Sequence, residues 1–429
     1  MATLAQMIPS AAPLQGTREL ADPEGDCSGH TAFISEATRI GEVVNERSVQ
    51  QPDGSATWLS PTTGAPLGPT LYDGTLGIAL FLAALDRVHG DGRHRALVLR
   101  AVAPLRRTVR ALAADADRAR RLRLGTGGLT GAGAFVYGLA RIGEWMGEPE
   151  LVRDAHLATV LLTRERIAGD DRLDVTDGSA GAVLALLALD GLCSSANTAD
   201  ATPVEIALDC AAHLLERRTS YSGRPRAWPG RDWPPLGGYA HGATGVALAL
   251  MRLYERTGRE ELRVAALEGI AFERGLYDGE TDNWWNPRYE RPLEQSAWCH
   301  GAPGIALGRA GGLGAYDDAE VRAEIGRTLR STRLLPDCPI DHLCCGNFGR
   351  VEILVTAGHA TGDADALEHA RGLAARSIAR ADAAGGYVLA RTDEPEGVRS
   401  SLFRGLAGVG MALLRLARPD AVPSPLLLA

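Results

Sequence analysis

The stretch DGTLGIALFLAAL, residues 73–85, begins with two glycines three positions apart and continues as an almost unbroken apolar run. A helix that is apolar nearly all round is a buried helix. Comparable segments recur along the chain at spacings of 45 to 64 residues, and their first glycines are Gly74, Gly128, Gly178, Gly242, Gly301, Gly346 and Gly405. Such regular recurrence indicates one repeat architecture rather than separate domains.

Amphipathic segments rich in Arg, Glu and Ala separate these apolar runs, for example residues 94–122 and 202–218. They predict outer helices with one solvated face. One inner and one outer helix per repeat would give an all-α protein, an α/α toroid of seven inner and seven outer helices. An open helical solenoid has the same composition. We favour the closed ring because the chemistry considered below needs residues of different repeats to meet.

The N-terminal 70 residues lack the repeat. We expect residues 1–34 to form a loosely ordered arm and residues 35–429 to form a single domain, with a first outer helix near residues 32–47. The net charge of −8 and the lack of a long basic run argue against a nucleic-acid partner. No stretch has the length of a membrane span, and the N-terminus lacks the features of a signal peptide. The seven cysteines then predict reduced thiols in a cytoplasmic protein.

Three cysteines lie just ahead of repeat glycines: Cys299 in Trp-Cys-His-Gly, and Cys344 and Cys345 in Leu-Cys-Cys-Gly. In a ring, neighbouring repeats are adjacent, so the three sulfurs can converge. Three protein ligands with one open position are typical of catalytic zinc, and thiolates select zinc over harder cations. His300 and His342 are possible replacements for one thiolate. Buried packing is the alternative role for all three cysteines, and it is the expected role of Cys27, Cys193, Cys210 and Cys338.

His241 immediately precedes its repeat glycine, in the register of these cysteines, and is therefore expected to face the same cavity. An imidazole both accepts and donates protons near neutral pH. Asp174 and Asp177 precede Gly178, and either is suited to cap the following helix. We expect Asp177 to be the cap and Asp174 to project across the mouth of the barrel.

The segments WCHGAPGIAL, LCCGNFG, GYAHGATG and LDVTDGSAG, together with the glycine repeats, resemble the lanthionine cyclases of lanthipeptide biosynthesis. The similarity covers about residues 35–429 and is greatest to the C-terminal cyclase domain of class II synthetases. It implies an α/α toroid with one Zn²⁺, bound by Cys299, Cys344 and Cys345. Cys345 stands where most members have histidine, which places the chain in a three-cysteine subgroup. The family's catalytic histidine and its acidic partner correspond to His241 and Asp174.

The resemblance implies a zinc-dependent peptide cyclase that adds cysteine thiols to dehydroalanine or dehydrobutyrine, forming (methyl)lanthionine rings in a ribosomal peptide. Its partners would be a dehydrated precursor peptide and a separate dehydratase, unless the chain is an excised domain. Some stand-alone members have an arginine and a tyrosine where this chain has Gln295 and His300, so an arginine-dependent step is not expected.

Four other functions stay open at this point. They are addition of an external thiol such as glutathione, zinc-dependent alkyl or prenyl transfer, glycoside hydrolysis with Asp73 and Asp177 as paired carboxylates, and a peptide-binding scaffold with inert cysteines. The low aromatic content of 5% argues against the aromatic pocket of a prenyl transferase.

Overall fold

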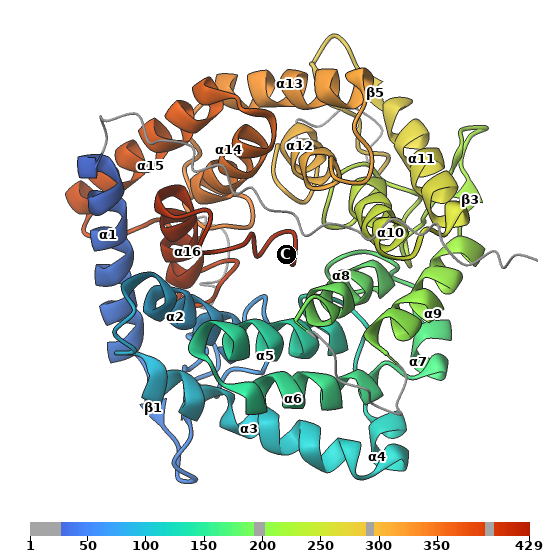
Figure 1. Ribbon diagram of the computed structural model, residues 1–429. Helices are drawn as coiled ribbons and strands as arrows, with labels where there is room; N and C mark the ends of the chain where they lie inside the picture. The colour runs from blue at the N-terminus through green and yellow to red at the C-terminus, as the bar shows by residue number, and fades with distance from the viewer. Residues whose placement is uncertain (1–26, 193–201, 289–295, 391–398) are drawn as a thin grey trace, which may run out of the picture.

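The computed structural model describes residues 27–192, 202–288, 296–390 and 399–429, and it forms two concentric rings of helices (Figure 1). The inner ring contains α2 (Thr75–His89), α5 (Ala132–Met146), α8 (Ser179–Asp190), α10 (Ala243–Thr257), α12 (Ala302–Gly311), α14 (Asn347–Thr361) and α16 (Leu406–Ala417). The outer ring contains α1 (Cys27–Glu46), α3 (Arg95–Ala113), α6 (Pro149–Ala158), α9 (Pro203–Glu216), α11 (Glu260–Arg274), α13 (Ala319–Leu334) and α15 (Ala364–Ala384). The predicted all-α toroid with seven helices in each ring is confirmed in the described part of the chain.

The ring is closed by the two ends of the repeat array. Each inner helix packs against the inner helices of the neighbouring repeats, and α16 packs against α2. Six inner helices pack on the outer helix that follows them in sequence, whereas α16 packs on α1. This closure excludes the open solenoid. Helix α1 begins at Cys27, earlier than expected, and residues 1–26 of the predicted arm lie outside the described residues.

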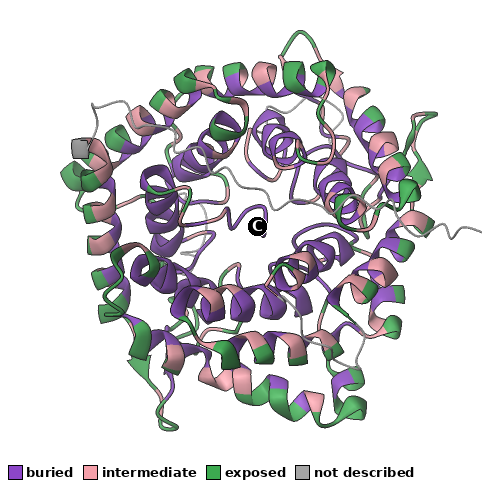
Figure 2. Ribbon diagram, viewed as in Figure 1, coloured by how far each residue is buried: buried purple, intermediate pink, exposed green. Residues whose placement is uncertain are grey.

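Burial follows the two-layer pattern that the sequence predicts (Figure 2). Every residue of α16 is buried, as are ten residues of α8. Helix α3 instead buries a stripe that includes Leu97, Ala101 and Leu105, and it exposes its arginine-rich face. The inner helices therefore form the core and the outer helices shield it from solvent.

The glycine pairs allow the loop before each inner helix to fold back over the helix's first turn. A Cβ atom at Gly77, Gly181 or Gly408 would lie about 2 Å from the carbonyl oxygen six residues earlier, at 2.1, 1.9 and 1.9 Å respectively. Such a contact is impossible without moving the backbone. The same relation holds for the second glycine of three further repeats: Gly245, Gly304 and Gly349.

The predicted register is wrong in the second repeat. The N-cap glycines of the other inner helices are those expected, but the N-cap of α5 is Gly131 rather than Gly128. Gly128 instead packs against Gly181 of the neighbouring repeat, where a Cβ would lie 2.9 Å from the Gly181 Cα. In the run GGLTGAG only Gly128 and Gly131 are three positions apart, so the pattern selects Gly128 as the cap although the helix begins after Gly131.

Shorter elements complete the fold. Helices α4 (Ala116–Arg121) and α7 (Arg164–Ala168) and the 3₁₀ helix η1 (Thr159–Leu161) lie between the longer helices. Three antiparallel hairpins follow α1, α9 and α11: β1 (Val49–Gln50) with β2 (Ala56–Thr57), β3 (Thr219–Ser220) with β4 (Arg226–Ala227), and β5 (Tyr277–Asp278) with β6 (Asn283–Trp284). No helix in the described ranges combines the length and apolarity of a membrane-crossing segment.

The end of the chain runs into the centre of the ring (Figure 1). Arg141 Nε donates to the Ala429 carbonyl at 3.1 Å, and Arg252 donates to the Leu427 carbonyl at 3.3 Å. Both arginines lie toward the C-terminal ends of their inner helices, α5 and α10. The tail therefore lies inside the ring, and Leu428 reaches the loop before α5, where its Cδ1 would lie 2.4 Å from a Cβ at Gly128.

Candidate active site and metal centre

The predicted site residues share one structural register at the mouth of the barrel, the end formed by the N-termini of the inner helices. Asp177, His241, His300 and Cys345 each immediately precede the N-cap glycine of an inner helix. Backbone hydrogen bonds join several of these loops across repeats, such as Val175 N–H to the Ala240 carbonyl at 3.2 Å. Residues far apart in sequence are thus brought to one end of the ring.

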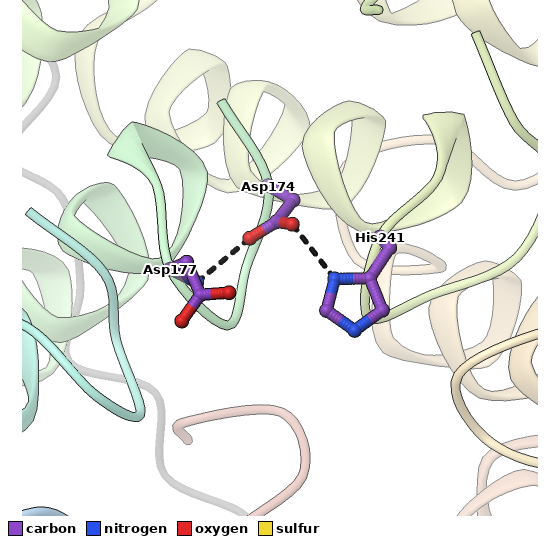
Figure 3. A group of neighbouring side chains, drawn as sticks. All are labelled: Asp174, Asp177 and His241. Carbon is purple, nitrogen blue, oxygen red and sulfur yellow. Dashed lines mark hydrogen bonds and ion pairs between the residues drawn. The ribbon is translucent and has the colours of Figure 1, made fainter. Parts of the chain in front are cut away.

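His241 and Asp174 form a hydrogen-bonded pair at this mouth (Figure 3). His241 Nδ1 lies 2.7 Å from Asp174 Oδ2, and Asp174 Oδ1 accepts the Asp177 backbone N–H at 2.7 Å. The His241 side chain is 31% exposed and that of Asp174 is 10% exposed. The pair is thus anchored on its carboxylate side and accessible on its imidazole side, as a proton-transferring histidine requires.

Burial and charge act in opposite directions on this pair. Burial alone would lower the pKa of His241, but the hydrogen bond and negative charge of Asp174, with the charge of Asp177, raise that pKa above its usual value. Burial raises the pKa of Asp174, and the His241 contact partly opposes this. A histidine held in this way keeps its proton to a higher pH than a free imidazole.

Asp170 holds the loop that presents Asp174, and it also caps α8. The prediction that Asp177 is this cap is therefore wrong. Asp170 Oδ2 accepts the Ser179 N–H at 2.7 Å, at the first residue of α8, and Asp170 Oδ1 accepts the Leu173 N–H at 3.3 Å. Leu173 has a φ of +65°, which a buried non-glycine residue rarely adopts. The Asp177 carboxylate instead accepts the Thr130 hydroxyl at 2.5 Å. The chain turns sharply at Leu173, so the acid nearest in sequence points away from the helix end.

The three predicted metal ligands lie together, in a row with Cys344 in the middle. The Cys344 sulfur interacts with both Cys299 and Cys345, and these interactions hold the pKa of Cys344 well below its usual value. The same contacts with Cys344, together with burial, raise the pKa of the Cys299 and Cys345 thiols. The three cysteines therefore interact through Cys344, the middle residue of the row.

The donor set fits a soft cation. Three adjacent sulfurs from two neighbouring repeats match the thiolate preference of zinc. The three sulfur atoms do not all lie within 4.8 Å of one another. In the described ranges, only Asp174, Asp177 and His241 place one potential ligand atom each within 4.8 Å of one another. That group is engaged in the hydrogen bonds described above.

Aromatic side chains back the cysteine row, and the motifs considered above did not predict them. Tyr72 stacks on Phe403 with ring centroids 4.8 Å apart, and Phe403 contacts Trp298 at 5.2 Å. The Tyr72 hydroxyl donates to Cys344 Sγ at 3.1 Å. Tyr72 stands two residues before its repeat glycine, as Cys299 and Cys344 do, and this shared register was the available signal.

The two histidines considered as alternative ligands occupy different positions. The His300 ring lies 5.8 Å from the His241 ring, and burial lowers the His300 pKa to about 3, so this imidazole is neutral. His342 is buried with its Nε2 4.0 Å from Cys345 Sγ and its Nδ1 accepting the Cys345 backbone N–H at 3.4 Å. His342 therefore supports the Cys345 loop.

Two of the remaining cysteines are placed by their helices, and a third lies beside the row. Cys210 is buried in α9 and Cys27 is the first residue of α1. Cys338 lies beside the row, where its sulfur contacts the Cys345 carbonyl oxygen at 3.7 Å and its peptide is held by Asn347. Cys193 and Gln295 fall outside the described residues.

A polar cavity of about 560 Å³ lies next to the His241–Asp174 pair. Asp177 connects the two, because its side chain lines the cavity and its backbone N–H donates to Asp174. Its walls also include Thr130, Arg172 and Arg231. Arg231 is paired with Asp171 at 2.7 Å. The cavity has room for several residues of a peptide, and Asp177 is the one residue of the Asp174–Asp177–His241 group that lines it.

Comparison with known proteins agrees with this arrangement. Residues 65–427 match the family model for lanthionine synthetase C-like proteins. The chain belongs to the lanthionine synthetase C-like family. Among solved structures, nisin cyclase superposes with a TM-score of 0.65 at 15% identity, covering 93% of this chain and 97% of the other. A GH76 alpha-mannanase from Bacteroides thetaiotaomicron gives a TM-score of 0.50 at 10% identity, with the same coverage. At these identities the structural matches establish the α/α toroid alone, and the family assignment rests on the sequence model.

Proposed function

We propose that this member of the lanthionine synthetase C-like family is a zinc-dependent peptide cyclase that forms (methyl)lanthionine thioether rings. The observation that carries the proposal is the meeting, at one mouth of the toroid, of a three-cysteine row and a His241–Asp174 pair. A thiol-binding centre and a proton donor are the two components that addition of a thiol to an activated double bond requires.

Cys299, Cys344 and Cys345 would hold the zinc ion, with one coordination position left open. When bound, the cation supplies a strong local positive charge that lowers the pKa of a substrate cysteine thiol. The side chains of the protein hold the remaining reactants. The cavity beside Asp177 would accommodate part of the peptide.

The bond changes balance within the substrate. The substrate thiol loses its proton, its sulfur bonds to the β-carbon of a dehydroalanine or dehydrobutyrine, and the carbon–carbon double bond becomes an enolate. Protonated His241 then donates a proton to the α-carbon from Nε2, because Nδ1 is occupied by Asp174. The proton released by the thiol restores His241, so the ring forms without an external reactant.

The chemistry of the substrate implies an earlier dehydration. We propose a separate dehydratase as the partner that converts serine and threonine of the precursor peptide to dehydro residues. Free thiols at the site are stable in a reducing compartment, which favours the cytoplasm.

Incubation of the protein with a dehydrated precursor peptide and glutathione tests the proposal against its nearest alternative. A cyclase leaves the peptide mass unchanged and removes cysteines from later alkylation with iodoacetamide. Addition of an external thiol instead raises the mass by one glutathione per dehydro residue and leaves the peptide cysteines open to alkylation.

A further inference from the structure

A hydrogen bond connects the first repeat of the ring to the cysteine row of the sixth. The Tyr72 hydroxyl donates to Cys344 Sγ at 3.1 Å, across 272 positions of sequence. Cys344 is the central sulfur of the row, in contact with both of the other proposed ligands. The hydroxyl therefore acts on the one sulfur that both neighbours share.

The position of this hydroxyl is fixed by Phe403 of the seventh repeat. The Tyr72 ring stacks on the Phe403 ring with an interplanar angle of 12°. The Phe403 N–H donates to the Tyr72 carbonyl at 3.1 Å, and the Phe403 carbonyl accepts the Cys344 N–H at 2.8 Å. Backbone and ring contacts thus hold donor and acceptor in one arrangement, which is how outer residues orient metal ligands.

In the hydrogen bond between Tyr72 and Cys344, the phenol hydroxyl is the donor and the sulfur is the acceptor. The tyrosine hydroxyl keeps its proton at neutral pH, and a thiolate has no proton to donate in return. A hydrogen bond to a charged acceptor stabilises that charge more than a bond between neutral groups does. Three thiolates place more negative charge on the site than two thiolates and a neutral histidine, so this chain has a particular need for such a donor.

We propose that Tyr72 is a positioning residue that withdraws electron density from the Cys344 thiolate, offsets the charge of the third cysteine and thereby sets the reactivity of the centre. This inference rests on the proposed zinc site. The first repeat provides none of the proposed metal ligands, but through Tyr72 it would influence the reactivity of the metal centre.

Cobalt substitution provides the test, because the energy of sulfur-to-cobalt charge-transfer bands reports the electron density on the thiolates. The variant Tyr72→Phe removes the donor and keeps the ring stacked on Phe403. Tyr239→Phe is the matched control. Tyr239 is fully buried and contacts Trp298 at 5.9 Å, but its hydroxyl has no hydrogen-bond partner among the described residues.

We expect the charge-transfer band of cobalt-loaded Tyr72→Phe to move to longer wavelength, and the band of Tyr239→Phe to coincide with that of the wild type. Zinc affinity should fall by roughly tenfold in Tyr72→Phe, the lower end of effects of outer hydrogen-bond partners. If Tyr72→Phe does not fold, 3-fluorotyrosine at position 72, a stronger donor of the same shape, should move the band to shorter wavelength.

A Tyr72→Phe band that coincides with that of the wild type would overturn the inference while leaving the proposed function intact. The inference fails equally if the fluorotyrosine protein leaves the band in place. A wild-type protein that binds neither cobalt nor zinc would instead refute the proposed metal site, so the two failures are distinguishable.

Discussion

His241 Nδ1 and Asp174 Oδ2 lie 2.7 Å apart although 67 positions separate them in the sequence. The contact spans two neighbouring repeats and turns the opposite ring nitrogen of His241, Nε2, away from the carboxylate (Figure 3). The pair therefore has one nitrogen for orientation and one for proton transfer.

The first prediction concerns the pH dependence of cyclisation. Protonated His241 is the proposed acid, so activity should fall as pH rises through its pKa, which Asp174 holds above the ordinary value. Asp174→Asn removes the charge that raises this pKa, while burial still lowers it. The alkaline limb of the rate profile should therefore move to lower pH. His241→Gln should reduce the rate by roughly 100-fold or more at every pH.

Asp177→Asn is the control for this experiment. It removes a nearby carboxylate that bonds to Thr130 rather than to His241. Its alkaline limb should lie much nearer that of the wild type. Equal displacement in Asp174→Asn and Asp177→Asn would contradict a specific role for the hydrogen-bonded pair.

The second prediction concerns Cys345, the proposed third thiolate. Cys345→His leaves the site one negative charge poorer, so a bound substrate thiolate should be less basic and less nucleophilic. Because thiolate reactivity falls with pKa at a slope of about 0.4–0.5, a drop of about two units would slow ring closure by roughly tenfold. The variant should also discriminate more between precursors. Rates and ring patterns measured on several dehydrated peptides provide the check, and unchanged values for both would count against the proposed role.

The third prediction concerns metal content. The wild-type protein should contain about one zinc per chain, and Cys299→Ala and Cys344→Ala should each contain almost none, since a three-ligand site does not survive the loss of one thiolate. Cys338→Ala is the matched control. Its thiol lies beside Cys345 but outside the row, so it should retain zinc. Elemental analysis with circular dichroism separates metal loss from unfolding; zinc retained in both ligand variants would exclude the assignment.

The fourth prediction concerns the glycine pairs. In Gly408→Ala the new Cβ would lie 1.9 Å from the Leu402 carbonyl oxygen and 2.9 Å from the Leu343 Cβ. We expect the free energy of unfolding to fall by at least about 2 kcal/mol, as overpacked cores do. Gly326→Ala in the outer helix α13 meets only the end of Arg330, at 3.5 Å. That control should gain about 0.5–1 kcal/mol from helix propensity. Chemical denaturation measures the free energy of unfolding of both variants. Equal losses of stability would show that the close backbone approach is not the reason for glycine at position 408.

The periodic part of the architecture was predictable from the sequence. Seven apolar runs introduced by glycine were enough to predict buried inner helices, and amphipathic stretches were enough to predict the outer layer. The register of the second repeat was not, because the pattern selects Gly128, which opens the only glycine pair there, whereas α5 is capped by Gly131. Gly128 is instead required by its close approach to Gly181 of the neighbouring repeat.

The site was predictable where function is tied to repeat register. Cys299, Cys344 and His241 stand just before repeat glycines, and the fold brings their loops to one mouth. The roles of Asp170 and Tyr72 were not predictable. Asp170 caps α8 from nine residues away because Leu173 adopts a left-handed conformation. Tyr72 shares the register of Cys299 and Cys344, but its contact with Cys344 depends on the closure of the ring between the seventh and first repeats.

Zinc-dependent thioether formation can be measured by mass spectrometry of a single dehydrated precursor peptide. The peptide is incubated with the wild-type protein, with protein stripped by a chelator, and with stripped protein to which zinc has been restored, and is then alkylated with iodoacetamide. We expect its cysteines to resist alkylation after the first and third incubations and to be fully alkylated after the second. Cysteines that remain open to alkylation in all three, or that close equally well in the stripped protein, would contradict the proposed function.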